Sequence, residues 1–294
     1  MVEPYLPVSL MPAEFELSPL TPTLGAEVEG LDLRQLGDDS FAALYRAWLE
    51  YKVLFLRGQS LELEQLEHFS RRFGDLMRLP YVKPHADHEH VIRVLKEADE
   101  VDMGVFGGDW HSDFSFLPQP PKASILYAEE IPPVGGDTLW ADMVQALARL
   151  PADLRDALHG RDAIHVGAPY GLSHAPPEDM QFRGSIEIER NNPEADRETP
   201  HPAICRHPES GREMLFINPT YTTRIDGYSD ADSAALLSRL FQHCTRPEFS
   251  CRFRWTAGSL ALWDNRSTMH YAVNDYDGHR RCLYRTTIQG EAPV

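Results

Sequence analysis

The spacing of apolar residues predicts four helical regions in this chain. Apolar side chains recur every three or four positions in segments 41–48, 66–73 and 236–244, which is the period of one helix face. A Ser or Asp lies shortly before each segment and favours a helix start, because its side-chain oxygen accepts hydrogen bonds from the first unpaired amides. A fourth helix is expected within 142–160, interrupted near Pro151.

Short apolar runs bounded by Gly, Pro, Asn or Asp predict strands along the rest of the chain. In segment 249–255 apolar and polar residues alternate, which is typical of a strand with one buried face. These strands do not alternate regularly with helices, so the pattern favours an antiparallel sandwich or barrel with added helices. The other predicted strands are 53–56, 91–95, 124–128, 137–141, 214–217 and 260–263.

Segment 168–200 lacks a clear period and is rich in Pro, Glu, Asp and Asn. A loop of this length within a compact domain is usually either a lid or a disordered segment, and the sequence leaves both open. The chain has no internal repeat and no linker-like stretch. We therefore expect a single domain over residues 1–294, with a lid loop at 168–200.

Charge and composition narrow the class of protein. The 294 residues carry a net charge of −17, which disfavours binding to nucleic acid or to an anionic membrane. No glycine-rich phosphate loop follows a strand, which disfavours a dinucleotide or P-loop enzyme. Neither a signal segment nor a long apolar span is present, and the four cysteines form no Cys-x-x-Cys pair. A cytoplasmic protein with free thiols is expected.

One segment has the residue types of a metal site. In His111-Ser112-Asp113, the first and third side chains would share one face of a strand and could reach the same ion. With a second His, such a pair suits iron(II) and leaves coordination positions open. The segment His85-Ala86-Asp87 has the same spacing and lies close to further histidines, although a solvated polar loop explains it as well. Gly107-Gly108, which permits close backbone approach, and the apolar Phe114 favour the His111 pair.

Further motifs decide between the two pairs. Trp110 precedes His111, and Gly135-Gly136-Asp137-Thr138 follows later in the chain. Segment 263–270 then reads Trp-Asp-Asn-Arg-Ser-Thr-Met-His, and Arg281 comes eleven positions after its His. In these motifs, their order and their spacing, the sequence strongly resembles the taurine dioxygenase and 2,4-D dioxygenase family (TauD/TfdA). The resemblance extends from about Leu24 to Gly290.

This resemblance implies a mainly β fold with flanking helices, the double-stranded β-helix or jelly roll. It implies that His111, Asp113 and His270 hold iron(II), and that Thr138 and Arg281 bind the distal carboxylate of 2-oxoglutarate. A planar guanidinium suits that task because it can donate two parallel charge-assisted hydrogen bonds to a carboxylate. The implied reaction uses O2 to hydroxylate a small molecule, with cleavage where the hydroxylated carbon bears oxygen or sulfur. A homo-oligomer, either dimer or tetramer, is also implied.

A different class of function stays open at this point. A metal-binding jelly roll without catalysis would serve as a sensor or storage module. Such a module would need no cosubstrate grip, whereas both Thr138 and Arg281 are present. The enzyme is therefore the preferred interpretation.

Residues near these motifs suggest the substrate class. Arg281, Leu283 and Arg285 alternate in a strand-like run and should point to one face, which would bring a second guanidinium into the barrel. We expect Arg285 to bind an anionic group of the substrate; the alternative is a permanent ion pair with a protein carboxylate such as Asp109.

The apolar body of the substrate is expected to meet Leu79 and Phe114. In taurine-specific members of the family, polar groups occupy the region after Arg-Phe-Gly, whereas here that region is more apolar. The interpretation therefore favours an aryloxyalkanoate, carboxylate or sulfonate over taurine.

Overall fold

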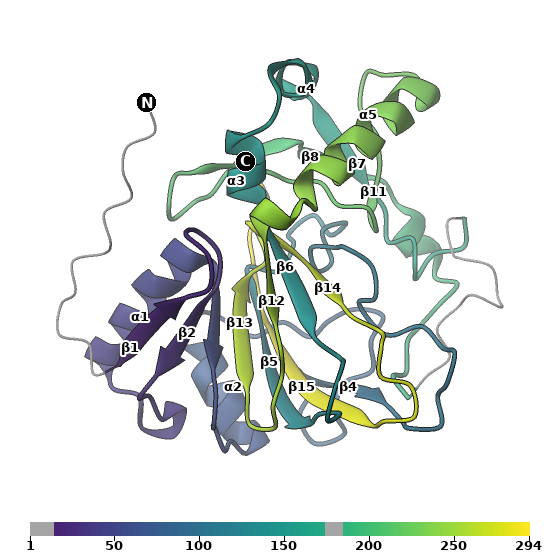
Figure 1. Ribbon diagram of the computed structural model, residues 1–294. Helices are drawn as coiled ribbons and strands as arrows, with labels where there is room; N and C mark the ends of the chain where they lie inside the picture. The colour runs from purple at the N-terminus through teal and green to yellow at the C-terminus, as the bar shows by residue number, and fades with distance from the viewer. Residues whose placement is uncertain (1–14, 174–184) are drawn as a thin grey trace.

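A computed structural model of the chain describes residues 15–173 and 185–294, and Figure 1 shows how their elements are arranged. The largest layer is a seven-stranded sheet in which neighbouring strands are antiparallel, except for β2 and β3. In spatial order its strands are β1 (Glu16–Pro19), β2 (Ala26–Glu29), β3 (Val53–Leu56), β13 (Leu260–Asp264), β5 (Ala123–Glu130), β15 (Arg281–Ile288) and β4 (Val91–Lys96).

A second sheet packs face to face against the large one. Its three strands, in order, are β12 (Ser250–Phe253), β6 (Thr138–Asp142) and β14 (Thr268–Ala272). The ring of Phe253 stacks on Phe55 of β3 with centroids 4.2 Å apart, and Trp140 of β6 meets Trp263 of β13 edge to face. Two mainly antiparallel sheets around an apolar core form the predicted jelly roll.

The described chain has a helix in each of the four predicted regions, and one of these regions contains two helices. Helices α1 (Asp38–Tyr51) and α2 (Leu63–Arg71) cover the outer face of the large sheet, and α5 (Asp230–Cys244) lies beyond the end of the small one (Figure 1). The helix expected within 142–160 is divided into α3 (Met143–Ala148) and α4 (Ala152–Leu158) at Pro151. Helix α2 ends two residues before the predicted end, because residues 72–74 form a turn.

Two predicted strands are shorter than expected. Segment 214–217 contributes only to β10 (Glu213–Leu215), which pairs with β9 (Ile204–Arg206). Segment 249–255 contains β12, but its first residue closes the 3₁₀ turn η4 (Pro247–Phe249). A further sheet was not predicted and consists of β11 (Thr222–Ile225), β7 (Asp162–His165) and β8 (Thr199–Pro202). A short 3₁₀ turn, η1 (Leu33–Gln35), precedes α1.

The expected lid segment 168–200 is only partly covered, since 174–184 lie outside the described residues. Its later part contains η3 (Pro193–Asp196), and β8 begins at Thr199, so regular structure starts before residue 200. Ile188 forms an isolated β-bridge with Val82, which holds this part of the segment against the chain near residue 82.

Two smaller expectations can also be compared with the structure. All four cysteines are free thiols, as predicted, and all four are buried. No helix within the described ranges is long and apolar enough to cross a bilayer.

Candidate active site

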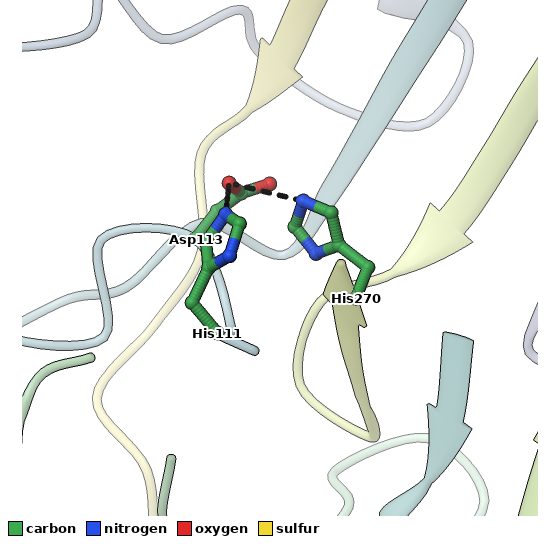
Figure 2. A group of neighbouring side chains, drawn as sticks. All are labelled: His111, Asp113 and His270. Atoms are coloured by element: carbon green, nitrogen blue, oxygen red, sulfur yellow. Dashed lines mark ion pairs between the residues drawn. The ribbon is translucent and has the colours of Figure 1, made fainter. Parts of the chain in front are cut away.

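His111, Asp113 and His270 come together beside β14. Their ligand atoms all lie within 4.8 Å of one another, and all three side chains are buried. Figure 2 shows one carboxylate oxygen of Asp113 facing both rings; this Oδ1 lies 3.4 Å from Nε2 of His111 and 3.7 Å from Nε2 of His270. Two neutral nitrogen donors and one carboxylate form a donor set that fits iron(II).

The local backbone differs from the predicted strand. His270 lies on β14, but His111 forms only an isolated antiparallel bridge with it, and Asp113 follows in a turn. The bridge has two backbone hydrogen bonds, of 3.0 Å from His111 N to His270 O and 2.8 Å in return. The two histidines therefore meet because their backbone segments pair as an antiparallel bridge. Asp113 does not reach the site by alternation along a strand, as had been expected for His111 and Asp113, because it lies in a turn. The predicted close approach of backbone exists, since a Cβ on Gly107 would lie 3.1 Å from Cε1 of His111.

The histidines are held in the form that binds a metal. Nδ1 of His111 lies 2.7 Å from the carbonyl oxygen of Asp109, so the ring donates there and leaves the Nε2 lone pair toward the site. Burial lowers the pKa of His270 well below its ordinary value, which keeps this imidazole neutral.

Asn265 fixes the backbone of Asp113, a role that the sequence reasoning missed. Its Oδ1 accepts from the amide of Asp113 at 2.6 Å, while its Nδ2 donates to the carbonyls of Asp113 at 2.9 Å and Pro121 at 3.0 Å. The neighbouring Asp264 is anchored by Arg266 through two hydrogen bonds of 2.9 and 2.7 Å. The Trp-Asp-Asn motif thus ties the turn that carries Asp113 to the end of β13.

Asp113 also pairs with a buried cation. Its Oδ2 lies 2.6 Å from Nη2 of Arg285 and accepts from Oγ of Ser124 at 2.9 Å. Burial alone would raise the pKa of Asp113, but the positive charge of Arg285 outweighs it and holds the pKa well below its usual range. A protein carboxylate is therefore paired with Arg285, although it is Asp113 and not Asp109. Nε of Arg285 has no hydrogen-bond partner within the described residues.

Arg281, Leu283 and Arg285 face the interior of the jelly roll, as their alternation predicts. The Cζ atom of Arg281 lies 5.9 Å from the ring centre of Trp255, Leu283 belongs to the core between the sheets, and Cζ of Arg285 lies 5.7 Å from the ring centre of Trp263. Thr286 points the other way, toward α2.

Arg281 is buried without a carboxylate partner in the described chain. Its side chain is only 4% exposed; Nε donates to Gly136 O at 3.1 Å, and Nη2 has no hydrogen-bond partner among the described residues. Burial lowers the pKa of Arg281. Thr138, two residues after Gly136, accepts from Nε1 of Trp255 at 3.0 Å. Gly136 suits this position, because its φ is +69° and a Cβ would lie 3.1 Å from the Arg281 side chain.

A cavity of about 210 Å³ opens onto His111 and Asp113. Its wall is largely apolar and aromatic, and includes Phe114 as expected. Leu79 does not line it, but packs in the same apolar cluster as Phe114 and borders a neighbouring cavity. Other residues on the wall are Phe106, Tyr170, Ile188, Arg190, Thr220 and Tyr221.

Comparison with known proteins places the chain in a family. The family described as taurine catabolism dioxygenase TauD, TfdA family matches residues 16–287. The chain belongs to this family. It is 36% identical to an alpha-ketoglutarate-dependent sulfate ester dioxygenase of Pseudomonas putida, over 96% of this chain and 91% of the relative. It is 35% identical to an alkylsulfatase of Acinetobacter baylyi, over 95% of this chain and 86% of the relative.

Other TauD/TfdA proteins are similarly close. The chain is 34% identical to the alpha-ketoglutarate-dependent 2,4-dichlorophenoxyacetate dioxygenase of Cupriavidus pinatubonensis, with 94% of this chain and 98% of the relative covered. The structure of a taurine dioxygenase from Burkholderia xenovorans superposes with a TM-score of 0.78 at 33% identity, covering 96% of this chain and 93% of that one. The structure of AAD-2 in complex with Mn(II) and N-oxalylglycine superposes with a TM-score of 0.75 at 27% sequence identity, covering 95% of this chain and 98% of that one.

Membership of the TauD/TfdA family decides the class of function. The chain is a 2-oxoglutarate-dependent dioxygenase that uses iron(II) and O2, and the non-catalytic metal-binding module is set aside. The residues present fit both groups: the buried His–Asp–His set suits iron(II), and the unpartnered Nη2 of Arg281 suits a carboxylate.

The second His-x-Asp segment is not gathered into such a site. His88 and His90 both approach Glu67, with Nδ1–Oε distances of 3.1 and 3.7 Å, and the ring of His85 is tilted by 48° against that of His88. Within the described residues, only the His111 group brings three ligand atoms together. This arrangement agrees with a polar loop.

Proposed function

We propose that His111, Asp113 and His270 hold the iron(II) of this dioxygenase. The proposal rests on one observation above all, the buried convergence of two imidazole nitrogens on one carboxylate oxygen. Three protein ligands on one side leave positions for 2-oxoglutarate and O2. When bound, iron(II) would let O2 react with 2-oxoglutarate, so that one oxygen atom enters succinate, which forms together with carbon dioxide, and the other enters a substrate C–H bond.

Arg281 and Thr138 bind the distal carboxylate of 2-oxoglutarate in this proposal. A buried guanidinium is costly unless its hydrogen-bond donors are satisfied. Nη2 of Arg281 lacks a partner in the described structure, and its Nε is already occupied by Gly136. Trp255 contacts Arg281 and donates to Oγ1 of Thr138, so the two residues share one neighbour.

The substrate that we propose is a small organic anion whose acid group meets Arg285. This guanidinium is buried beside Asp113 and keeps one N–H, on Nε, without a partner among the described residues. Phe114 gives the cavity wall an apolar surface, with Leu79 packed in the same cluster. Relatives named for sulfate esters and for phenoxy acids both act on molecules with an acid group and an apolar body.

The reaction outcome depends on which carbon faces the iron. Hydroxylation of a carbon that carries an ether, ester or sulfur atom gives a product that breaks down at that bond. For a sulfate ester the products are an aldehyde and sulfate, and for an aryloxyalkanoate they are a phenol and an oxo acid. The chain's own residues position this carbon and exclude water from it.

The proposal also covers the domain organisation, the compartment and the oligomeric state of the enzyme. Residues 1–294 act as one domain, and the described ends of segment 168–200 contribute Pro169, Tyr170, Ile188 and Arg190 to the cavity wall. The enzyme is cytoplasmic and a dimer or tetramer, without nucleic-acid or membrane partners; the buried free thiols agree with a reducing compartment.

The test is a substrate panel with protein purified without oxygen and then given iron(II), 2-oxoglutarate and air. Alkyl sulfates, aryloxyacids, sulfonates and carboxylates are compared with neutral ester analogues by succinate release. We expect at least one acid to stimulate succinate release and its neutral analogue to be a poor substrate. Equal turnover of a neutral analogue and its parent acid would contradict the anionic-substrate proposal.

A further inference from the structure

The turn formed by Gly135 and Gly136 contacts the side chain of Arg281. The carbonyl oxygen of Gly136 accepts a hydrogen bond of 3.1 Å from Nε of Arg281. Nη2 of Arg281 has no hydrogen-bond partner among the described residues. The turn therefore restrains the guanidinium through Nε and leaves Nη2 available to a ligand.

Asp275 holds the same turn from another side. Its Oδ1 accepts from the amide of Gly136 at 2.7 Å. A Cβ on Gly135 would lie 2.7 Å from that Oδ1 and 2.8 Å from the carbonyl oxygen of Asp275, and φ of Gly135 is +83°. A residue with a side chain could not approach Asp275 so closely in this conformation. Asp275 and Arg281 thus both bond to Gly136, Asp275 to its amide and Arg281 to its carbonyl.

A cation on β12 approaches the Asp275 carboxylate. Nε of Arg252 pairs with Oδ2 of Asp137 at 2.6 Å, and its Nη2 lies 3.8 Å from Oδ2 of Asp275. Asp137 lies between the turn and β6, and its carbonyl accepts from the amide of Val273 at 2.9 Å. Residues 135–137 are therefore fastened by side-chain and main-chain bonds to the segment that follows β14.

Asp275 reaches Arg281 through the Gly136 backbone, and no ion pair joins the two side chains in the described chain. A carboxylate paired directly with Arg281 would compete with a carboxylate ligand for the same donors. A carboxylate that bonds to Gly136 can instead orient the guanidinium and leave Nη2 unoccupied. The Asp275 side chain is 45% exposed, so water satisfies its remaining acceptor positions.

We propose that Asp275 is a positioning residue for the cosubstrate, because it holds Gly136 where Arg281 presents Nη2 to the distal carboxylate of 2-oxoglutarate. A guanidinium that is already oriented loses less entropy when it binds. This inference rests on the proposed function and adds to it a residue that touches neither the metal nor the cosubstrate.

The test is a calorimetric titration of Mn(II)-loaded protein with two ligands. N-oxalylglycine has a distal carboxylate, and N-methyloxamate is the same molecule without it, so the ratio of their Kd values reports how well that carboxylate is bound. The proteins are wild type, Asp275→Ala, Asp275→Asn, Arg281→Ala and the double variant with Ala at both positions. Asp226→Ala is the matched control, because it removes an exposed carboxylate that pairs with Arg224 at 3.0 Å just after β11.

Asp275→Ala should raise the Kd of N-oxalylglycine roughly three- to tenfold, as expected for one lost hydrogen bond, and leave the Kd of N-methyloxamate unchanged. Asp275→Asn should bind both ligands nearly as wild type, since its Oδ1 can still accept from the Gly136 amide. Arg281→Ala should lose more affinity for N-oxalylglycine, and the double variant should bind it no more weakly than Arg281→Ala. Asp226→Ala should bind as wild type.

Wild-type affinity for N-oxalylglycine in Asp275→Ala, together with a loss in Arg281→Ala, would overturn the inference and leave the proposed function in place. An equal loss of affinity for both ligands would also overturn it, because Asp275 would then support the metal site as a whole. The same holds if Asp275→Asn loses as much affinity as Asp275→Ala. If Arg281→Ala binds N-oxalylglycine as wild type, the proposed role of Arg281 fails together with the inference.

Discussion

Replacement of Asn265 by Ala should weaken both the fold and the metal site. The Asn265 side chain is fully buried and makes three hydrogen bonds, two of them to the backbone of Asp113. Alanine would leave one amide and two carbonyls inside the protein without these partners. Since iron binding requires Asp113 in one orientation, loss of this support should allow the carboxylate to move away from the histidines.

The expected loss of stability follows from the number of hydrogen bonds that the Asn265 side chain makes. At about 1 kcal/mol for each of the three, the free energy of unfolding should fall by about 3 kcal/mol. That corresponds to a decrease in Tm of roughly 6 °C or more, at about 2 °C for each kcal/mol in a large domain. Iron(II) affinity should fall by roughly ten- to a hundredfold, as is usual when a residue that orients a metal ligand is removed.

The assay combines thermal unfolding with anaerobic iron(II) titration of the variant. Asn274→Ala is the control, because this exposed amide also makes two hydrogen bonds but contacts none of the three proposed ligands. It should lower the free energy of unfolding by at most about 1 kcal/mol and leave iron affinity unchanged. A lower Tm for Asn265→Ala with wild-type iron affinity would refute the claim that Asn265 positions Asp113.

Four further substitutions test the two proposed cosubstrate residues, the proposed substrate cation and a buried histidine of β7. Arg281→Ala should raise the KM for 2-oxoglutarate roughly ten- to a hundredfold, since a charge-assisted hydrogen bond contributes about 1.5–3 kcal/mol. Thr138→Val should raise this KM by a smaller factor. An unchanged KM in Arg281→Ala would mean that another cation binds the cosubstrate. Arg285→Gln should raise the KM for the organic anion by a larger factor than the concentrations of 2-oxoglutarate and iron(II) needed for activity. A larger increase in the concentration of iron(II) or 2-oxoglutarate needed would indicate that the main role of Arg285 is its ion pair with Asp113. Burial lowers the pKa of His165 from 6.5 to about 3, so protonation favours the unfolded chain and stability is lost as pH falls from about 6.5 toward 3. His165→Asn should lose less stability over that interval in urea unfolding, and an identical pH dependence would show that other groups control it.

Much of the fold could be predicted from the sequence, because the apolar residues that recur at the period of a helix or strand are the residues that the folded chain buries. Leu236, Leu240 and Cys244 form the buried face of α5, and an isolated helical stripe of this kind can be recognised without tertiary information. Phe249 shows the limit of such patterns. It continues the alternation of β12 but sits in a 3₁₀ turn, because Pro247 cannot donate to a strand ladder.

The metal-binding candidates were found through motifs, whereas their supports depend on long-range contacts. Asn265 and Asp113 are 152 positions apart, and no local pattern connects them. The same is true of the ion pair between Asp113 and Arg285, where the sequence suggested Asp109 as the alternative partner. Arg190 lies in a segment without a period, so only the folded cavity reveals its position. The one available signal for Asn265 was its place in the Trp-Asp-Asn motif at the end of a predicted strand.

The central claim is tested most directly by counting bound iron(II) without oxygen. Wild-type protein should bind one equivalent, while His111→Ala, Asp113→Ala and His270→Ala should each bind far less or none under the same conditions. His85→Ala should bind as wild type, because His85 lies in a loop whose histidines do not converge on the site. Loss of iron in His85→Ala together with full binding in His111→Ala would contradict the account.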